Sequence, residues 1–327
     1  MIVPYALRLL CLCLASFFVV NAAAGLAAGL ASRGIVRMAE TMRPRSAARV
    51  LFGVRVLPCV LGAGAVLFFC VPSYLWLEPQ SYSERMGWAC LTLALLGAAG
   101  WLGSFGRVAR ALAASVRFRR AWQEAGCTIL LLDESSTAVI VNKDAPLLAL
   151  VGLFRPRLII SDALVRSLSL EELQVALLHE NAHRDSRDNL KRLALLLAPA
   201  PIPFFRVFFS LEHSWTKLSE WAADDEAVRG DSQRALSLAT ALLRVARMMG
   251  TAPRLSFLHT SLCAGDHDLS ARVDRLLTLQ PAPAKTLSRT RTVAIGSSLG
   301  TAACIALFLT WPATLSSVHR LLELFLR

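Results

Sequence analysis

Residues 179–183 read His-Glu-Asn-Ala-His, within the run ELQVALLHENAHRDSRDNL that covers residues 172–190. Four residues advance an α-helix by slightly more than one turn, so His179 and His183 project from one face, close enough to share a tetrahedral Zn²⁺. Glu180 follows the first histidine, in the position from which a carboxylate takes a proton from the attacking water. The stretch therefore predicts a helix that carries two zinc ligands and a general base.

Signals upstream of this run predict how the helix begins and what precedes it. Ser169 can cap the first turn while Glu172 reaches back, which is the capping-box pattern. Three short apolar runs bounded by Gly, Pro, Asp or Asn predict strands, namely 127–132 (CTILLL), 146–154 (PLLALVGLF) and 157–161 (RLIIS). The helix is therefore expected to follow a small sheet in an α+β domain.

An acidic pattern downstream supplies the third ligand. The run LSEWAADDEAV at 218–228 has helical periodicity and places Glu220 and Asp224 one turn apart on one face. Glu220 completes a His₂Glu zinc site with an open position, and Asp224 accepts the other ring N–H of a ligand histidine. A solvated acidic helix is the alternative reading. His267 is a candidate donor to the oxyanion, against the alternative of a surface-loop histidine.

The chain as a whole is too apolar for an ordinary soluble protein. Of its 327 residues 55% are hydrophobic and only 18% charged, and its mean hydropathy is +0.52. Uncharged stretches longer than the roughly 20 residues needed to span a bilayer predict four transmembrane helices, at 9–32, 56–77, 86–106 and 292–318. A shorter, proline-containing run within 193–210 is expected to be re-entrant or interfacial.

Arginine asymmetry predicts the orientation of these helices. The segment 32–55 carries six arginines against one acid, and 107–120 carries five arginines, so both are expected on the cytoplasmic side. The chain then divides into three helices within 1–106, a cytoplasmic domain at 107–291, the fourth helix and a short exterior tail at 319–327. A cleaved signal peptide at 1–24 is the alternative, but it would leave the arginine-rich loop on the wrong face.

The net charge of +12 is therefore attributed to topology, and no nucleic-acid partner is expected. Most of the eight cysteines lie in apolar runs, and no CxxC pair is present, which argues against a disulfide or cysteine–zinc framework.

Together with GLFRPRLII at 152–160, EWAADDEA at 220–227 and ARVDR at 271–275, the HExxH run resembles the BlaR/MecR-type membrane metallopeptidases, metallopeptidase family 56. The resemblance implies a mainly α integral membrane protein of the bacterial inner (cytoplasmic) membrane, with an inserted gluzincin-like zinc peptidase domain facing the cytoplasm. Carried over, His179, His183 and Glu220 match the zinc ligands, Glu180 the catalytic base and Asp224 the acidic residue after the third ligand. HtpX and CAAX-processing proteases share the combination of an HExxH motif with a later ExxxD motif, and they are the nearest alternative families.

The function implied is zinc-dependent cleavage of a protein or peptide substrate at the membrane, in signal transduction by cleaving a repressor or the protease itself. Strand addition along 146–154 is one way to hold such a substrate. A quality-control or processing protease is the alternative, and a non-hydrolytic receptor with structural zinc is another. A structural site would be expected to have four ligands and no spare Glu180. A homodimer is left open.

The chain departs from the best-known members of this family at its end. Those members continue into a penicillin-binding sensor domain, whereas only about nine residues follow the last predicted span here. No β-lactam acylation is therefore expected. Ser214-Trp-Thr-Lys217 spells the SxxK motif of such sensors, but it lies between the predicted zinc ligands and is interpreted as coincidence.

Overall fold

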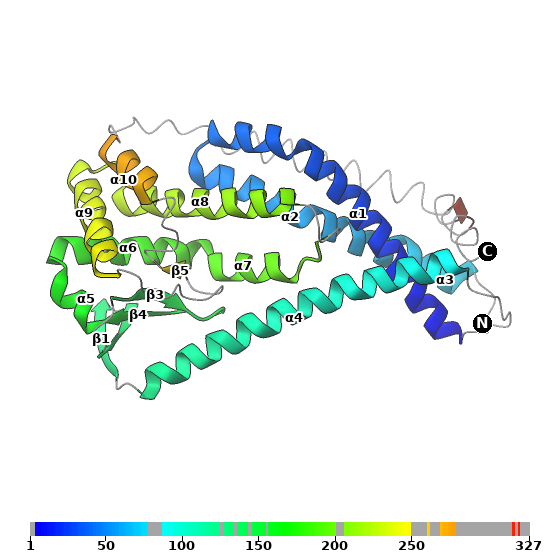
Figure 1. Ribbon diagram of the computed structural model, residues 1–327, viewed down its shortest axis with the longest axis horizontal. Helices are drawn as coiled ribbons and strands as arrows, with labels where there is room; N and C mark the ends of the chain where they lie inside the picture. The colour runs from blue at the N-terminus through cyan, green and yellow to red at the C-terminus, as the bar shows by residue number, and fades with distance from the viewer. Residues whose placement is uncertain are drawn as a thin grey trace.

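Long helices occupy the first part of the chain. The computed structural model describes residues 4–77, 87–124, 127–133, 136–142, 146–154, 156–200, 206–249, 260–261, 269–278, 316–317 and 320. In it α1 (Tyr5–Glu40) is followed by α2 (Pro44–Ala65), which continues through a π-helical turn, η1 (Val66–Cys70), into α3 (Val71–Leu77). The 37-residue α4 (Trp88–Glu124) then leads to the sheet. Figure 1 shows these helices extending from a mixed α/β region.

Three of these stretches, Tyr5–Glu40, Pro44–Leu77 and Trp88–Arg120, are long and apolar enough to cross a membrane. They contain the predicted spans 9–32 and 56–77 and nearly all of 86–106, but each is longer than predicted. A 36-residue helix rises about 54 Å, against a hydrocarbon core of about 30 Å. The helices therefore reach well beyond the apolar layer. The fourth predicted span, 292–318, lies outside the described residues except for 316–317, and so does the loop 78–86.

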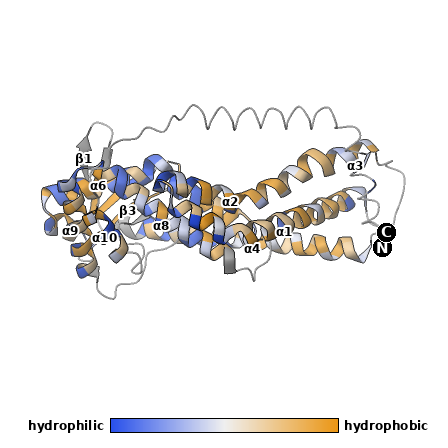
Figure 2. Ribbon diagram, turned by 90° about the horizontal axis from the view of Figure 1, so that it is seen from above, coloured by the Kyte–Doolittle hydropathy of each residue, from blue (hydrophilic) through white to orange (hydrophobic). Residues whose placement is uncertain are grey.

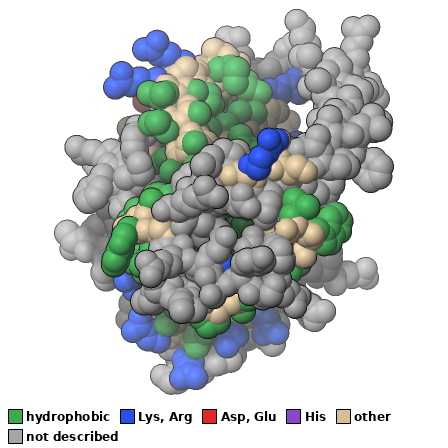
Figure 3. All heavy atoms as spheres, turned by 90° about the vertical axis from the view of Figure 1, so that its right-hand side faces the viewer, with side chains coloured by type: hydrophobic (Ala, Val, Ile, Leu, Met, Phe, Trp, Pro, Cys, Tyr) green, Lys and Arg blue, Asp and Glu red, His purple; other side chains and the backbone are tan. Residues whose placement is uncertain are grey.

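The apolar surface of the helical part agrees with a membrane location. Figure 2 shows α1, α2 and α4 as mostly hydrophobic ribbons, while hydrophilic residues concentrate around α6 and α9. Figure 3 shows the molecule from the end at which α1 and α4 begin. Among the side chains that are coloured by type, most are hydrophobic, and lysine and arginine lie mainly toward the periphery. Close helix packing depends on glycine, since a Cβ at Gly97 of α4 would lie 2.5 Å from the backbone oxygen of Leu14 in α1.

A five-stranded sheet follows α4, in the order β1-β2-β4-β3-β5. The strands are β1 (Cys127–Asp133), β2 (Ser136–Val141), β3 (Leu148–Val151), β4 (Arg157–Ser161) and β5 (Thr260–Ser261). All pairings are antiparallel except β2 with β4, which is parallel. The three predicted strands are present as β1, β3 and β4, whereas β2 and β5 were not predicted.

Six helices complete the α/β region: α5 (Asp162–Ser167), α6 (Leu170–Ser186), α7 (Asp188–Leu197), α8 (Arg206–Val228), α9 (Ser232–Met249) and α10 (Leu269–Thr278). The predicted capping box is formed, because Ser169 Oγ accepts from the backbone N–H of Glu172 while the Glu172 carboxylate accepts from that of Ser169. Helix α6 ends at Arg187, which adopts a left-handed backbone conformation with φ 54°. This turn separates α6 from α7 and sets the angle between them.

Two apolar clusters hold these elements. One lies between the sheet and the helices α5, α6, α9 and α10, and includes Leu150, Leu164, Ala176 and Leu242. The other joins the membrane helices to α8, with Trp215 of α8 and Leu51 of α2 both buried in it. Beside this second cluster Arg55 Nε donates to Glu212 Oε1 at 2.7 Å. The helix that carries Glu220 is thus packed directly on α2.

The connection between α7 and α8 lies against the membrane helices. Asn21 of α1 donates from Nδ2 to the carbonyl of Pro199 at 3.4 Å. Arg107 of α4 donates to the carbonyls of Leu196 and Ala198 at 3.2 and 3.4 Å. The segment 193–210 was predicted to be re-entrant. Its first residues form the end of α7, its last residues form the start of α8, and residues 201–205 lie outside the described part of the chain.

Candidate metal centre

Two neighbouring helices bring the predicted ligands to one point. His179 and His183 lie one turn apart on α6, and Glu220 faces them from α8; all three side chains are buried. The two Nε2 atoms are 3.2 Å apart. Glu220 Oε2 lies 3.5 Å from Nε2 of His179, and its Oε1 lies 3.6 Å from Nε2 of His183. The structure therefore brings the three together as the sequence predicted.

These separations fit a metal ion. Tetrahedral zinc with Zn–N bonds of about 2.0–2.1 Å holds neighbouring ligand atoms about 3.3 Å apart. The observed distances of 3.2, 3.5 and 3.6 Å lie close to that value. Two imidazole nitrogens and a carboxylate are also the donor set of many catalytic zinc sites. The side chains can thus hold a divalent metal with little rearrangement.

A carboxylate lies beside Nδ1 of each imidazole. Nδ1 of His179 lies 3.0 Å from Asp224 Oδ1, and Nδ1 of His183 lies 2.7 Å from Asp188 Oδ2. A ring that donates from Nδ1 keeps its Nε2 lone pair for the ligand position. Asp224 therefore lies where the sequence predicted, beside a ligand histidine.

Asp188 was not among the site residues predicted from the sequence. It is buried at 4% exposure. Ser219 Oγ donates to its Oδ2 at 2.9 Å and Lys191 Nζ to its Oδ1 at 2.7 Å. The sequence signal was weak, since Asp188 lies five residues after His183 and a turn must intervene before the two can meet.

Arg272 of α10 connects the acidic residues of the centre. Its Nε and one terminal nitrogen donate to the two oxygens of Asp224 at 2.9 and 2.7 Å. Its other terminal nitrogen lies 3.2 Å from Glu220 Oε2. The buried guanidinium offsets the charge of two buried carboxylates. No role was predicted for Arg272 from the sequence. His267, the candidate oxyanion donor, lies outside the described residues.

The surroundings shift the acidity of the carboxyl groups in opposite directions. Burial raises the pKa of Glu180 to about 7, although the neighbouring histidines oppose this. Burial would also raise the pKa of Asp224, but the charge of Arg272 and the contact with His179 outweigh it and lower the pKa to about 2. Glu180 is thus suited to accept and return a proton near neutral pH, while Asp224 stays ionised.

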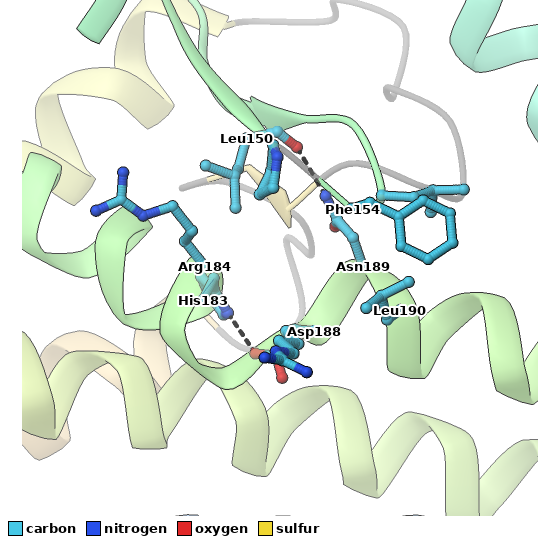
Figure 4. A pocket seen from close by; sticks show the side chains of 10 residues that line it. Leu150, Phe154, His183, Arg184, Asp188, Asn189 and Leu190 are labelled. Atoms are coloured by element: carbon cyan, nitrogen blue, oxygen red, sulfur yellow. Dashed lines mark hydrogen bonds and ion pairs between the residues drawn. The ribbon is translucent and has the colours of Figure 1, made fainter. Parts of the chain in front are cut away.

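A cavity of about 470 Å³ opens beside the centre, between the end of β3 and the start of α7. His183 and Asp188 line it together with apolar side chains (Figure 4). Strand β3 borders it and is not a free edge, because β5 pairs with Ala149 and Leu150. Strand addition at these two residues, one predicted way of holding substrate, would therefore require β5 to leave.

A membrane-embedded helical part joined to an α/β region with a metal-binding group beside a buried glutamate is the architecture of a membrane-associated metallopeptidase. Comparison with known families agrees, since residues 92–276 match the family model described as BlaR1 peptidase M56. That match covers more than half of the chain and includes the three converging residues and Glu180, so the chain belongs to the M56 peptidase family. No curated protein and no solved structure matches the chain.

Proposed function

We propose that this protein is a zinc-dependent endopeptidase that cleaves a protein substrate at the cytoplasmic face of the bacterial inner membrane. The observation that carries the proposal is the convergence of His179, His183 and Glu220 next to the buried Glu180. Two ligand residues on α6, a third on the neighbouring α8 and a separate carboxylate make a hydrolytic site rather than a four-ligand structural one.

His179, His183 and Glu220 would hold the zinc ion through two Nε2 atoms and a carboxylate. A zinc ion held there would supply a Lewis acid for the scissile carbonyl and for water. Glu180 would take a proton from the attacking water and return it to the leaving amine, for which a pKa of about 7 is suitable. Asp224 and Asp188 keep the imidazoles oriented, and Arg272 keeps Asp224 and Glu220 in place.

The orientation and domain limits are part of the same proposal. Arginine-rich segments at 32–55 and 107–120 favour a cytoplasmic domain at 107–291, with a fourth helix at 292–318 and an exterior tail at 319–327. The bonds from Asn21 and Arg107 to the end of α7 support a re-entrant connection between α7 and α8. Asn21 lies near the middle of the predicted span 9–32, so this connection would lie within the bilayer.

The proposed substrate class is a regulatory protein, such as a transcriptional repressor, or the peptidase itself. A quality-control or processing protease of the HtpX or CAAX type is the second candidate, favoured by the same pairing of HExxH with a later acidic helix. In either case a homodimer is compatible with the proposal. A non-hydrolytic membrane receptor with structural zinc is the candidate from another class.

The deciding experiment uses the full-length protein purified in detergent. Metal content is measured by atomic emission, and cleavage of casein is followed with and without a chelator. We expect about one zinc per chain and cleavage that the chelator abolishes. Glu180→Gln is the matched control, since it should keep zinc and lose cleavage. Stoichiometric zinc without cleavage in the native protein would instead favour the receptor.

A further inference from the structure

The cavity beside His183 is lined mostly by residues that have no part in the proposed hydrolysis. It lies between the end of β3 and the start of α7, and its volume of about 470 Å³ falls in the range of about 300–1,000 Å³ typical of small-ligand pockets. Its apolar lining includes Leu150, Phe154 and Leu190. Phe154 is 83% exposed at the border, so an entering apolar side chain would cover it. The interior therefore suits an apolar group.

Asn189 forms part of the wall of this cavity. It donates from Nδ2 to the carbonyls of Leu150 and Gly152 at 3.0 and 2.9 Å (Figure 4). These two hydrogen bonds hold the start of α7 against the end of β3, so the two sides of the cavity are fixed relative to each other.

Two arginines give the lining of the cavity a positive charge. Arg184 and Arg187 both line the cavity, and among the described residues neither forms an ion pair. The one acid in the lining, Asp188, is already engaged by His183, Ser219 and Lys191. A ligand in this cavity therefore meets two guanidinium groups whose charge is not offset.

From these contacts we infer that the cavity is a substrate subsite next to the scissile bond, and that it selects an apolar residue flanked by an acidic one. Leu150, Phe154 and Leu190 receive the apolar side chain, and Arg184 and Arg187 bind the carboxylate. The inference rests on the proposed peptidase function, because the link between the cavity and the reaction is His183, a proposed zinc ligand that lines the cavity.

The test begins by mapping cleavage sites in a peptide library by mass spectrometry, using the full-length protein in detergent. A cleaved sequence is then made as a matched pair that differs only by Asp or Lys beside the apolar residue. We expect the native protein to favour the Asp peptide in kcat/KM by roughly fivefold, the upper range for an exposed ion pair. Arg184→Gln with Arg187→Gln should bring the ratio to about one, and Arg184→Glu with Arg187→Glu should invert it.

Arg247→Glu on α9 is the charge control, because Arg247 is exposed and does not line the cavity. It should keep the native ratio. A native ratio that persists in the double Glu variant would overturn the subsite while leaving the peptidase function in place.

A second readout separates the two claims. Binding of the same peptides to Glu180→Gln, with and without the arginine changes, is measured by fluorescence anisotropy. If binding inverts with arginine charge while the cleavage ratio does not, the cavity binds peptides away from the scissile bond and the subsite is wrong. If neither cleavage nor binding depends on these arginines, the subsite is wrong.

Discussion

His183 and Asp188 belong to different helices, yet Nδ1 of the imidazole lies 2.7 Å from Oδ2 of the carboxylate. Arg187, the residue between α6 and α7, makes this contact possible through its left-handed conformation at φ 54°. The first residue of α7 is thereby turned back toward the last turn of α6. The orientation of one proposed ligand thus depends on how two helices join.

Replacing Asp188 with Asn should weaken metal binding about 10–100-fold, the usual effect of removing a carboxylate that orients a ligand histidine. The affinity is measured by competition with a chromogenic chelator. Asp185→Asn is the matched control, because Asp185 is exposed near the end of α6, three residues before Asp188. Equal affinity in the two variants would show that Asp188 does not orient the ring.

Glu180→Gln should separate metal binding from chemistry. Its metal content should remain, while peptide cleavage falls about 100- to 10,000-fold, the range for loss of a general base. His183→Ala and Glu220→Ala should each lose metal and activity, because each removes a ligand. Retained cleavage in Glu180→Gln would exclude the proposed base, and retained metal in Glu220→Ala would require another third ligand.

Arg272→Gln should destabilise the α/β region, because it leaves Asp224 buried without its bidentate partner. Breaking a buried ion pair on one side typically costs about 3–5 kcal/mol. The loss is read from the midpoint of chemical unfolding of the purified protein. Arg229→Gln breaks only an exposed pair with Glu226 and should stay within about 0.5 kcal/mol. Similar midpoints for the two variants would contradict the role given to Arg272.

Trp215→Ala should weaken the junction between α8 and the membrane helices. Its indole is 2% exposed within the cluster that includes Leu51. Truncating such a side chain typically costs about 3–5 kcal/mol. Phe209→Ala, on the same helix but 69% exposed, should have little effect on the unfolding midpoint in detergent. If Trp215→Ala and Phe209→Ala gave the same unfolding midpoint, this cluster would not be what holds α8 on the membrane helices.

Reporters fused after residue 120 or 285 should be cytoplasmic, and reporters at residue 80 or the C-terminus should be exterior. The arginine asymmetry between the loops requires this arrangement. Paired alkaline phosphatase and fluorescent protein fusions give opposite signals on the two sides. A cytoplasmic C-terminus would mean that 193–210 spans the bilayer completely.

Local periodicity was sufficient to predict the centre of the site. His179 and His183 follow from the helical repeat, and Glu220 with Asp224 from the repeat of a second helix, so helix packing alone had to bring them together. Asp188 could not be predicted this way, because its contact depends on the backbone conformation of Arg187. Strand β2 was missed because its apolar run, Val139 to Val141, is short, and β5 because two residues far along the chain carry no periodic signal.

The length of α4 couples the bilayer to the sheet. Its 37 residues span about 55 Å, and near its far end Phe118 packs against a cluster that includes Ala149 and Val151 of β3. Helices respond to hydrocarbon thickness by tilting. A tilt of about 5° about the outer end of such a rod displaces the other end by about 5 Å. We therefore expect a change of bilayer thickness to displace β3, the strand that borders the cavity beside His183, and activity after reconstitution in lipids of graded chain length would test this.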